Sequence, residues 1–325
     1  MNLARRRPWL ARVAAVTVVA AAAACARNAD VEPPATLSPQ TVAGAPIGID
    51  SVALIRDVAV LAHDSMQGRA VATPGSAKAR AYLEPRFRAA GLQPIGTSFL
   101  QPFTFSGGGR QIQGVNIVGQ LRGTALPERY FVITAHYDHV GVRNGQVFNG
   151  ADDNASGIAA LLALADHFRK NPPRHSLIFG ALDAEETGLA GARAFVASPP
   201  VPKQNIVLNI NMDMVSRNDQ GELYVAGTHS YPQLLPFVQR AVAAAEVKLI
   251  PGHDRPGVPG VDDWTGLSDH GAFHAAGIPF LYFGVEDHAD YHRATDDVER
   301  IQPGFYLRAV RTIINATRIL DAGLS

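Results

Sequence analysis

Apolar runs typical of β-strands alternate with helix-like segments through most of this chain, and this alternation restricts the fold more than any other feature. The predicted strands are 115–120, 129–135, 176–182, 205–212 and 279–283. The predicted helices are 51–61, 76–90, 156–169, 189–197, 233–245, 269–276 and 305–320. Such a pattern predicts an α/β fold with a mostly parallel, mixed central sheet and helices on both faces. Since no repeat or linker divides it, we expect a single domain over residues 49–325.

The first 24 residues are typical of a secretory signal peptide. They contain four arginines, no acid and an apolar run at 13–24, which is shorter than the roughly 20 residues of a membrane-spanning helix. The only cysteine, Cys25, follows three alanines in a pattern that resembles a lipobox, and simple cleavage at a small-residue site is the alternative. We therefore predict an exported protein, periplasmic or anchored by lipid at Cys25 (outer membrane) or secreted, with residues 26–48 as a flexible tether.

Composition excludes several kinds of function. A single cysteine leaves no internal disulfide, no CxxC redox motif and no cysteine-rich zinc site. The 29 basic and 29 acidic side chains balance, which argues against a protein built to bind nucleic acid. Any metal site must therefore be made from the 11 histidines and from carboxylates.

Acids and histidines follow the predicted strands directly. His136 and Asp138 come after the strand at 129–135, and on an extended chain they point to the same side. An aspartate in that position can orient a metal-bound histidine. Asp152 and Asp153 precede an apolar helix, where helix capping is the simple interpretation. Two adjacent acids before a buried helix nevertheless favour a nearby cation.

The later strands end in the same way. Glu185 and Glu186 follow the strand at 176–182, Asp213 follows 205–212, and His292 comes after 279–283. Two ionised glutamates in a dry site would repel each other, and a metal on one with a proton on the other removes that conflict. The whole set suits two divalent ions that share a carboxylate. Nitrogen and oxygen donors without thiolate fit zinc best, with cobalt and manganese as alternatives.

These motifs, in this order, resemble those of the co-catalytic zinc aminopeptidases, family twenty-eight of the metallopeptidases. The resemblance covers roughly residues 50–320 and includes Asp-Ser-Met-Gln-Gly-Arg at 64–69 and Ser-Asp-His at 268–270. It implies a zinc-exopeptidase (phosphorylase/hydrolase-like) fold. Some relatives carry an inserted protease-associated domain, for which the nine residues between Phe105 and Val115 leave no room.

The resemblance implies two zinc ions per chain, bridged by an aspartate. The implied metal ligands are His136 and Asp213 for one ion, Glu186 and His292 for the other, and Asp152 for both. It also implies a cis peptide bond between Asp152 and Asp153.

The resemblance assigns catalytic roles as well. Glu185 would be the general base and acid, Asp138 would orient His136 through its free ring nitrogen, and Tyr291 would stabilise the oxyanion. Asp269 is expected either to cap a helix or to contact Glu185. Trp264 would line the pocket or lie in a surface loop, and the other histidines considered, His288 among them, would be surface or core residues.

The implied activity is hydrolysis of the N-terminal peptide bond by a metal-bridged water. The implied partners are peptides or dipeptides with a free N-terminus, with no nucleic acid and no membrane contact beyond a lipid anchor. Two alternatives use the same fold: a glutaminyl cyclase-like transferase with one zinc, and a non-catalytic binding protein. Dipeptidases and carboxypeptidases within the family are further alternatives, so exopeptidase is the safer word.

Overall fold

A computed structural model of the protein describes residues 47–325, so the predicted leader, Cys25 and nearly all of the predicted tether lie outside the described residues. Within 47–325, no helix combines the length and the apolar character that crossing a membrane requires. The helices are α1 (Ser51–Leu61), α2 (Pro74–Ala89), α3 (Gly157–Lys170), α4 (Ala190–Ala197), α5 (Leu235–Ala243), α6 (His270–Ala275) and α7 (Pro303–Gly323). The strands are β1 (Gln93–Pro94), β2 (Leu100–Gly107), β3 (Arg110–Leu121), β4 (Leu126–His136), β5 (Gly141–Arg143), β6 (Gln146–Phe148), β7 (His175–Leu182), β8 (Ile206–Asp213), β9 (Glu222–Ala226), β10 (Lys248–Pro251) and β11 (Phe280–Gly284).

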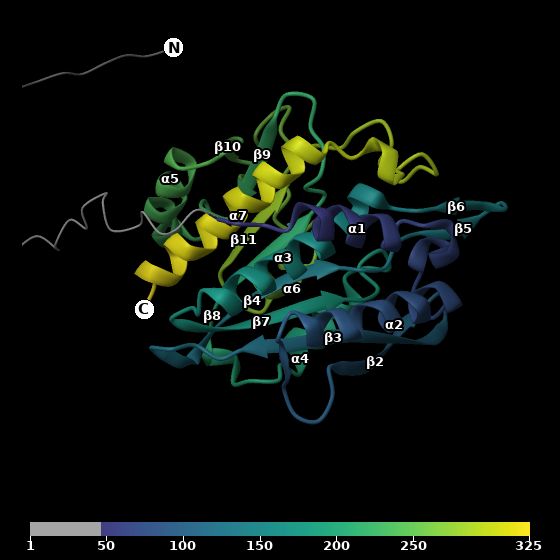
Figure 1. Cartoon of the computed structure of the whole chain (residues 1–325), viewed down its shortest axis with the longest axis horizontal. Coiled ribbons are helices and arrows are strands. Elements are labelled where there is room, and N and C mark those ends of the chain that lie inside the picture. Colours follow the sequence, from purple (N-terminus) through teal and green to yellow (C-terminus); the bar gives the residue numbers. More distant parts are fainter. Residues whose placement is uncertain (1–46) are drawn as a thin grey trace, which may run out of the picture. The chain divides into compact units, whose positions relative to one another are not determined.

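The fold is a single-domain α/β arrangement around a mixed sheet, as the strand–helix alternation predicts (Figure 1). The strand order is β1-β3-β7-β4-β8-β11-β9-β10, and β2 pairs with β3. Parallel pairing joins β7, β4, β8 and β11 in the centre and β9 to β10. Antiparallel pairing joins β1, β2 and β7 to β3 and joins β9 to β11. The parallel part of the sheet is therefore its centre.

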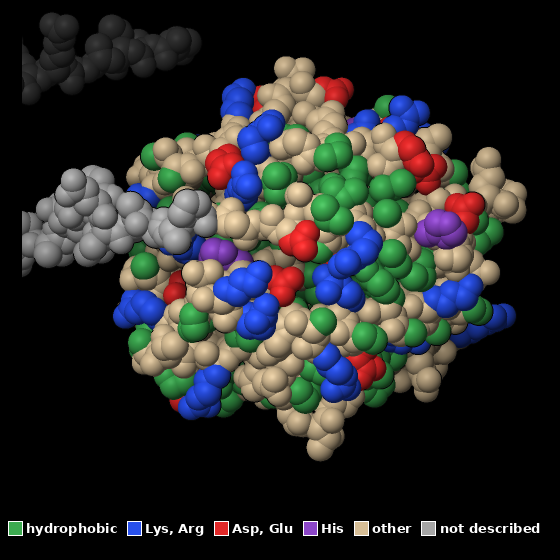
Figure 2. Space-filling model, viewed as in Figure 1, with side chains coloured by type: hydrophobic (Ala, Val, Ile, Leu, Met, Phe, Trp, Pro, Cys, Tyr) green, Lys and Arg blue, Asp and Glu red, His purple; other side chains and the backbone are tan. Residues whose placement is uncertain are grey.

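Helices cover both faces of that centre. Every residue of β7 is buried, as a strand with helices on each side must be. On one face α3 packs against β4, β7 and β8, and α1 and α7 pack against α3. In Figure 1 these three helices lie in front of the sheet. The helices α4 and α6 pack against each other, and they contact β3 and β11 respectively. On the face that Figure 2 shows, basic and acidic side chains are interspersed with apolar ones, and neither charge forms a continuous patch there.

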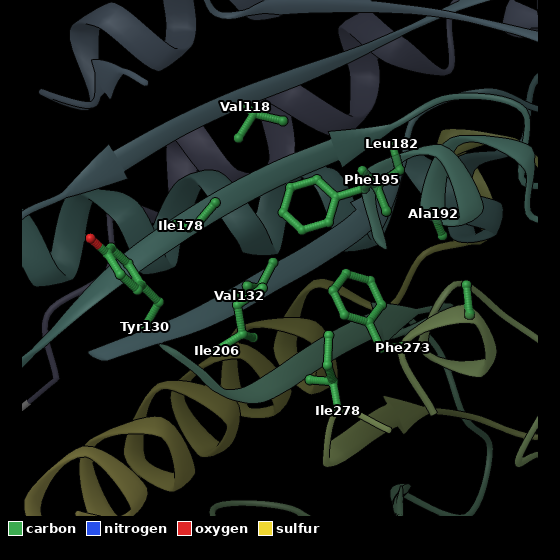
Figure 3. Packing of buried hydrophobic residues seen from close by; sticks show 11 residues of the cluster. Val118, Tyr130, Val132, Ile178, Leu182, Ala192, Phe195, Ile206, Phe273 and Ile278 are labelled. Atoms are coloured by element: carbon green, nitrogen blue, oxygen red, sulfur yellow. The ribbon is translucent and has the colours of Figure 1, made fainter. Parts of the chain in front are cut away.

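One hydrophobic cluster fixes α4 and α6 to the sheet (Figure 3). The rings of Phe195 from α4 and Phe273 from α6 lie 5.5 Å apart between centroids. They pack over strand residues that include Val132 and Ile178, which are fully buried. Burying an aromatic side chain of this size contributes about 1.5–3 kcal/mol. This packing holds the two helices beside the strands whose ends carry the acids.

Four strands of the large sheet, β1, β2, β9 and β10, lie outside the strand-like runs found in the sequence. β2 pairs with β3 as an antiparallel hairpin, and the turn between them contains Gly108 and Gly109, both with positive φ. Glycine adopts that conformation without steric cost, so the glycine run at 107–109 has a structural role. β9 and β10 are short, and only some of their residues are buried. Their sequences are therefore less recognisable as strands than the continuous apolar runs of β7 and β8.

A buried arginine ties the first helical segment to the loops around the sheet edge. Arg69 is fully buried and donates hydrogen bonds to backbone carbonyl oxygens, at 2.7 Å to Tyr137, 2.6 Å to Asn149 and 3.0 Å to Gly150. Its guanidinium group also donates to the carbonyl of Leu61 at the end of α1. The segment after β4 and the segment before α3 are therefore held at a fixed separation.

Candidate metal centre

Side chains from separate parts of the chain meet at the carboxyl edge of the central strands. β4, β7 and β8 run parallel, so their carboxyl ends lie side by side. A helical turn at Ala151–Ser156 enters this edge ahead of α3, and the loop after β11 returns to it. The residues that meet there with metal-ligand spacing are His136, His139, Asp153, Glu186, Asp213 and His292.

Four of these side chains form one group of potential ligands, His139, Asp153, Glu186 and His292. The Nε2 atom of His292 lies 3.1 Å from Glu186 Oε2 and 3.1 Å from Asp153 Oδ2. The Nδ1 atom of His139 lies 2.7 Å from Glu186 Oε1 and 3.5 Å from Asp153 Oδ2. Donor atoms bound to one zinc at about 2.0–2.2 Å lie about 3–4 Å apart, and three of the four separations fall in that range.

The second group contains His136, Asp153 and Asp213. His136 Nε2 lies 3.2 Å from Asp213 Oδ1 and 3.5 Å from Asp153 Oδ1. Asp153 thus turns one carboxylate oxygen towards each group. This is the arrangement that a carboxylate shared by two cations requires.

The chemistry of these donors fits a cation. Neither ring nitrogen of His139 has a hydrogen-bond partner among residues 47–325, and the same holds for Asp153 Oδ2 and Glu186 Oε1. Buried polar atoms in this state are costly unless something else binds them. The carboxylates of Asp153 and Glu186 raise the pKa of His292 to about 10, so the cluster attracts positive charge. Imidazole and carboxylate donors without thiolate suit zinc.

The prediction that Asp152 bridges the metals is wrong, because its carboxylate is engaged elsewhere. Its Oδ1 accepts hydrogen bonds from the backbone N–H of Ser216 at 2.8 Å and from the Ser216 hydroxyl at 2.7 Å. Its Oδ2 lies 3.1 Å from Nε2 of His288. Successive side chains of the turn point in different directions, and Asp153 is the one that faces the metal ligands. The cis peptide bond is likewise one residue later than predicted, between Asp153 and Asn154.

The turn that carries these aspartates is held by a distant residue. The carboxylate of Asp296 accepts hydrogen bonds from the backbone N–H groups of Asp152 and Asp153, each at 3.0 Å to the nearer oxygen. The side chain of Asn154 donates to the carbonyl of Met212, next to the end of β8. These contacts set the direction of each side chain in the turn.

The predicted contact between the Asp138 carboxylate and His136 is also wrong in detail. His136 Nδ1 lies 3.1 Å from the backbone carbonyl oxygen of Asp138, which can only accept a hydrogen bond, and 3.7 Å from its carboxylate. The carboxylate instead accepts the backbone N–H groups of Glu185 at 3.0 Å and Glu186 at 3.3 Å. Asp138 therefore holds both His136 and the glutamate segment, through different atoms.

A pocket of about 210 Å³ lies beside the potential metal ligands. Glu185 and Trp264 line it, as does Tyr291, whose ring stacks on His292 at 4.0 Å between centroids. Trp264 is therefore part of a pocket wall. Burial raises the pKa of the Glu185 carboxyl well above its ordinary value, against the opposing influence of His136. Burial also raises the pKa of Tyr291, so its hydroxyl remains a hydrogen-bond donor at neutral pH.

The remaining candidates have mixed outcomes. Asp269 stands before α6 but makes no side-chain capping hydrogen bond, so the capping interpretation is wrong. Burial raises the pKa of its carboxyl to about 7. His288, expected on the surface or in the core, contacts Asp152. His139 was missed, although a second histidine directly after His136-Tyr137-Asp138 at a strand end was a signal that could have found it.

Comparison with known proteins agrees with this geometry. The sequence profile of peptidase family M28 matches residues 116–317. A probable zinc metalloprotease of Leptosphaeria maculans is 33% identical over 147 residues, which is 43% of this chain and 33% of that protein. Leupeptin-inactivating enzyme 1 of Streptomyces exfoliatus is 29% identical over 298 residues, 89% of this chain and 61% of that enzyme. The chain thus spans about a third of the first relative and less than two thirds of the second.

Solved structures share the fold at low sequence identity. A zinc aminopeptidase from Bacillus subtilis matches with a TM-score of 0.69 and 17% identity, over 84% of this chain and 95% of that chain. A glutaminyl cyclase from Bacteroides thetaiotaomicron, bound to N-acetylhistamine, matches with a TM-score of 0.67 and 18% identity, over 85% and 99%. Both hydrolase and cyclase chemistry therefore occur on this fold.

Proposed function

Because this chain belongs to peptidase family M28, we propose that it is a zinc-dependent exopeptidase that hydrolyses the N-terminal peptide bond of peptides. The observation that carries the proposal is the pair of ligand groups that share Asp153 beside a pocket lined by Glu185. His136 and Asp213 would hold one zinc, and Glu186, His292 and His139 would surround the other. Zinc bound there would supply Lewis acidity and make a water molecule acidic near neutral pH.

The protein's own residues perform the proton transfers. Glu185 belongs to neither ligand group, and its raised pKa suits a carboxyl that takes a proton from the attacking water and returns it to the leaving amine. The hydroxyl of Tyr291 donates a hydrogen bond to the carbonyl oxygen as that oxygen gains negative charge. The carboxylate of Asp138 keeps Glu185 in place by accepting a hydrogen bond from the backbone N–H of Glu185.

The pocket favours a positively charged peptide end. Outside the ligand groups, its lining includes the carboxylates of Asp262, Glu286 and Asp287 from the surrounding loops. A protonated N-terminal amine is attracted to such a surface, whereas a C-terminal carboxylate is repelled. Peptides and dipeptides with a free N-terminus are therefore the proposed substrates, in preference to carboxypeptidase substrates.

Export is a further part of the proposal. The basic start, apolar run and single cysteine of the first 25 residues support a leader that is removed at Cys25. Mass spectrometry of the mature N-terminus after expression in a bacterial host tests this. A lipid-modified Cys25 supports anchoring, and an intact leader in the cytoplasmic fraction would contradict export.

A glutaminyl cyclase is the second candidate, because solved cyclases share the fold. The two functions differ in metal content and in product. We expect two zinc ions per chain by elemental analysis and release of free amino acids from amino-acyl arylamides and dipeptides. One zinc ion per chain, together with ammonia release from N-terminal glutaminyl peptides, would contradict the exopeptidase function and support the cyclase function.

The adjacent aspartates provide a matched pair of variants. We expect Asp153→Asn to lose both zinc ions, because a neutral amide cannot bind two cations. Asp152→Asn removes a carboxylate from the same turn but from outside both groups, so the two zinc ions should remain. Elemental analysis of the two purified proteins checks this, and equal zinc content in both variants would contradict the role of Asp153.

A further inference from the structure

The two ligand groups are unequal, and His139 is the cause of the difference. We propose that His139 binds the metal held by Glu186 and His292, so that this site takes the first zinc tightly while the site of His136 and Asp213 takes a second, exchangeable zinc. The inference rests on the proposed function and deepens it. It goes beyond the five ligands that the motifs predict, because it assigns different tasks to the two metals.

The position of His139 carries the first step of the argument. Its side chain is essentially inaccessible to solvent, and neither of its ring nitrogens has a hydrogen-bond partner in the described part of the chain. Nδ1 lies only 2.7 Å from Glu186 Oε1, but the contact lacks hydrogen-bond geometry and both atoms are left without a partner. A cation between the two atoms satisfies both of them, which no residue within 47–325 does.

The backbone around His139 is built to hold its ring there. Gly150, with φ of 57°, lies so close that a Cβ atom at this position would meet the ring at 2.6 Å. Arg69 binds the carbonyls of both Tyr137 and Gly150 and so fixes the two sides of this contact. The carboxylate of Asp138, the preceding residue, is bound to the N–H of Glu186. His139 and Glu186 are therefore positioned together.

The number of donors then separates the two sites. The group with His139 offers two imidazoles and two carboxylates, whereas the other group offers one imidazole and two carboxylates, and Asp153 is counted in both. Zinc with four protein ligands is typical of a closed site, and zinc with three keeps a position open for water or substrate. The group with three donors is thus the one that keeps a position open. Glu185, the proposed base, lines the same pocket as Asp213 and His292.

Zinc titration in competition with a chromogenic chelator tests the inference on the full chain after metal removal. We expect two binding steps for the wild type, separated by at least about 100-fold in affinity. In His139→Gln the tighter step should weaken by more than the 10–100-fold typical of losing an outer partner of a ligand, and the weaker step should change little. His167→Gln, which removes a buried histidine from α3, should leave both steps unchanged.

A zinc-loaded crystal structure gives the second readout. We expect His139 Nδ1 at about 2.0–2.1 Å from the metal near Glu186. A separation above about 3 Å, or unchanged zinc affinities in a folded His139→Gln protein, would overturn the role of His139 while leaving the proposed function intact. A wild-type chain that binds two zinc ions but releases no amino acid would overturn the function alone. A wild-type chain that binds no zinc would overturn both.

Discussion

At the scale of single residues, neighbours in sequence have separate tasks. Glu186 approaches His139 and His292, whereas Glu185 lines the pocket and stays outside both ligand groups. Asp153 faces the ligands, whereas Asp152 binds Ser216. In each pair, one acid is suited to a metal, while the other lines the pocket (Glu185) or accepts hydrogen bonds from Ser216 (Asp152). The identity of each residue type matters less than the direction in which the backbone presents it.

Replacing Glu185 with Gln should separate metal binding from turnover. We expect Glu185→Gln to keep two zinc ions and to lower kcat by about 10²–10⁴-fold, the typical contribution of a positioned general base. Glu128→Gln, a change of the same kind at an exposed side chain, should leave kcat unchanged. Steady-state kinetics and elemental analysis on the same samples check this, and wild-type kcat in the metal-replete Glu185→Gln protein would remove Glu185 from the mechanism.

At the scale of elements, the C-terminal helix anchors the strand that delivers the glutamates. The carboxylate of Asp321 near the end of α7 accepts the backbone N–H groups of Arg174 and His175, each at 2.8 Å. His175 Nδ1 lies 2.9 Å from the same carboxylate, and its ring stacks on Phe131 of β4. The start of β7 is thereby fixed, and its far end leads to the metal ligands.

Asp321 should make the stability of this anchor dependent on pH. Burial alone would raise the pKa of Asp321, but the hydrogen bonds from His175 and from the backbone N–H of Arg174 outweigh it and lower the pKa. The stabilisation is therefore present above the unfolded-state pKa of about 3.9 and is lost as the pH falls through the folded-state value. Asp321→Asn should cost about 1–3 kcal/mol at neutral pH.

Urea unfolding of both proteins at several pH values measures this difference. The gap in unfolding free energy between wild type and Asp321→Asn should narrow as the solution is acidified below about pH 4. A gap that stays constant over that range would show that the ionised carboxylate is not the stabilising form.

At the scale of the whole molecule, the candidate metal centre brings together side chains that follow different strands of the sheet. The carboxylates of Asp153, Glu186 and Asp213 lie within metal-ligand distance of three imidazoles, those of His136, His139 and His292. Without a cation these carboxylates repel one another. Zinc binding should therefore stabilise the fold as well as activate it.

Removal of zinc should lower the melting temperature in a reversible way. At a zinc concentration 100 times Kd, binding to the folded state alone contributes about 2.7 kcal/mol per site. Calorimetry in EDTA, then after zinc is restored, measures the change. Asp153→Asn should melt at the same temperature under both conditions, and a similar zinc response in that variant would place the stabilising metal elsewhere.

The pattern of apolar runs by itself determined the α/β class, the central strands and the edge of the sheet where the chemistry lies. These features depend on local periodicity and on which residues follow each strand. Both can be recognised within short stretches of sequence. Glu186, Asp213 and His292 belong to the ligand groups, as their strand-end positions predict. The same reasoning could not find β9 and β10, whose runs are short and only partly buried.

Only the tertiary structure decided which aspartate faces both groups of potential ligands, that His139 lies in one of these groups, and that the backbone carbonyl of Asp138 contacts His136. Each depends on the direction of a side chain in an irregular turn. That direction is set by partners far away in sequence, such as Asp296, which binds the N–H of Asp152 across 144 residues. No local pattern encodes such a contact, because it exists only once the strands have brought their ends to one edge.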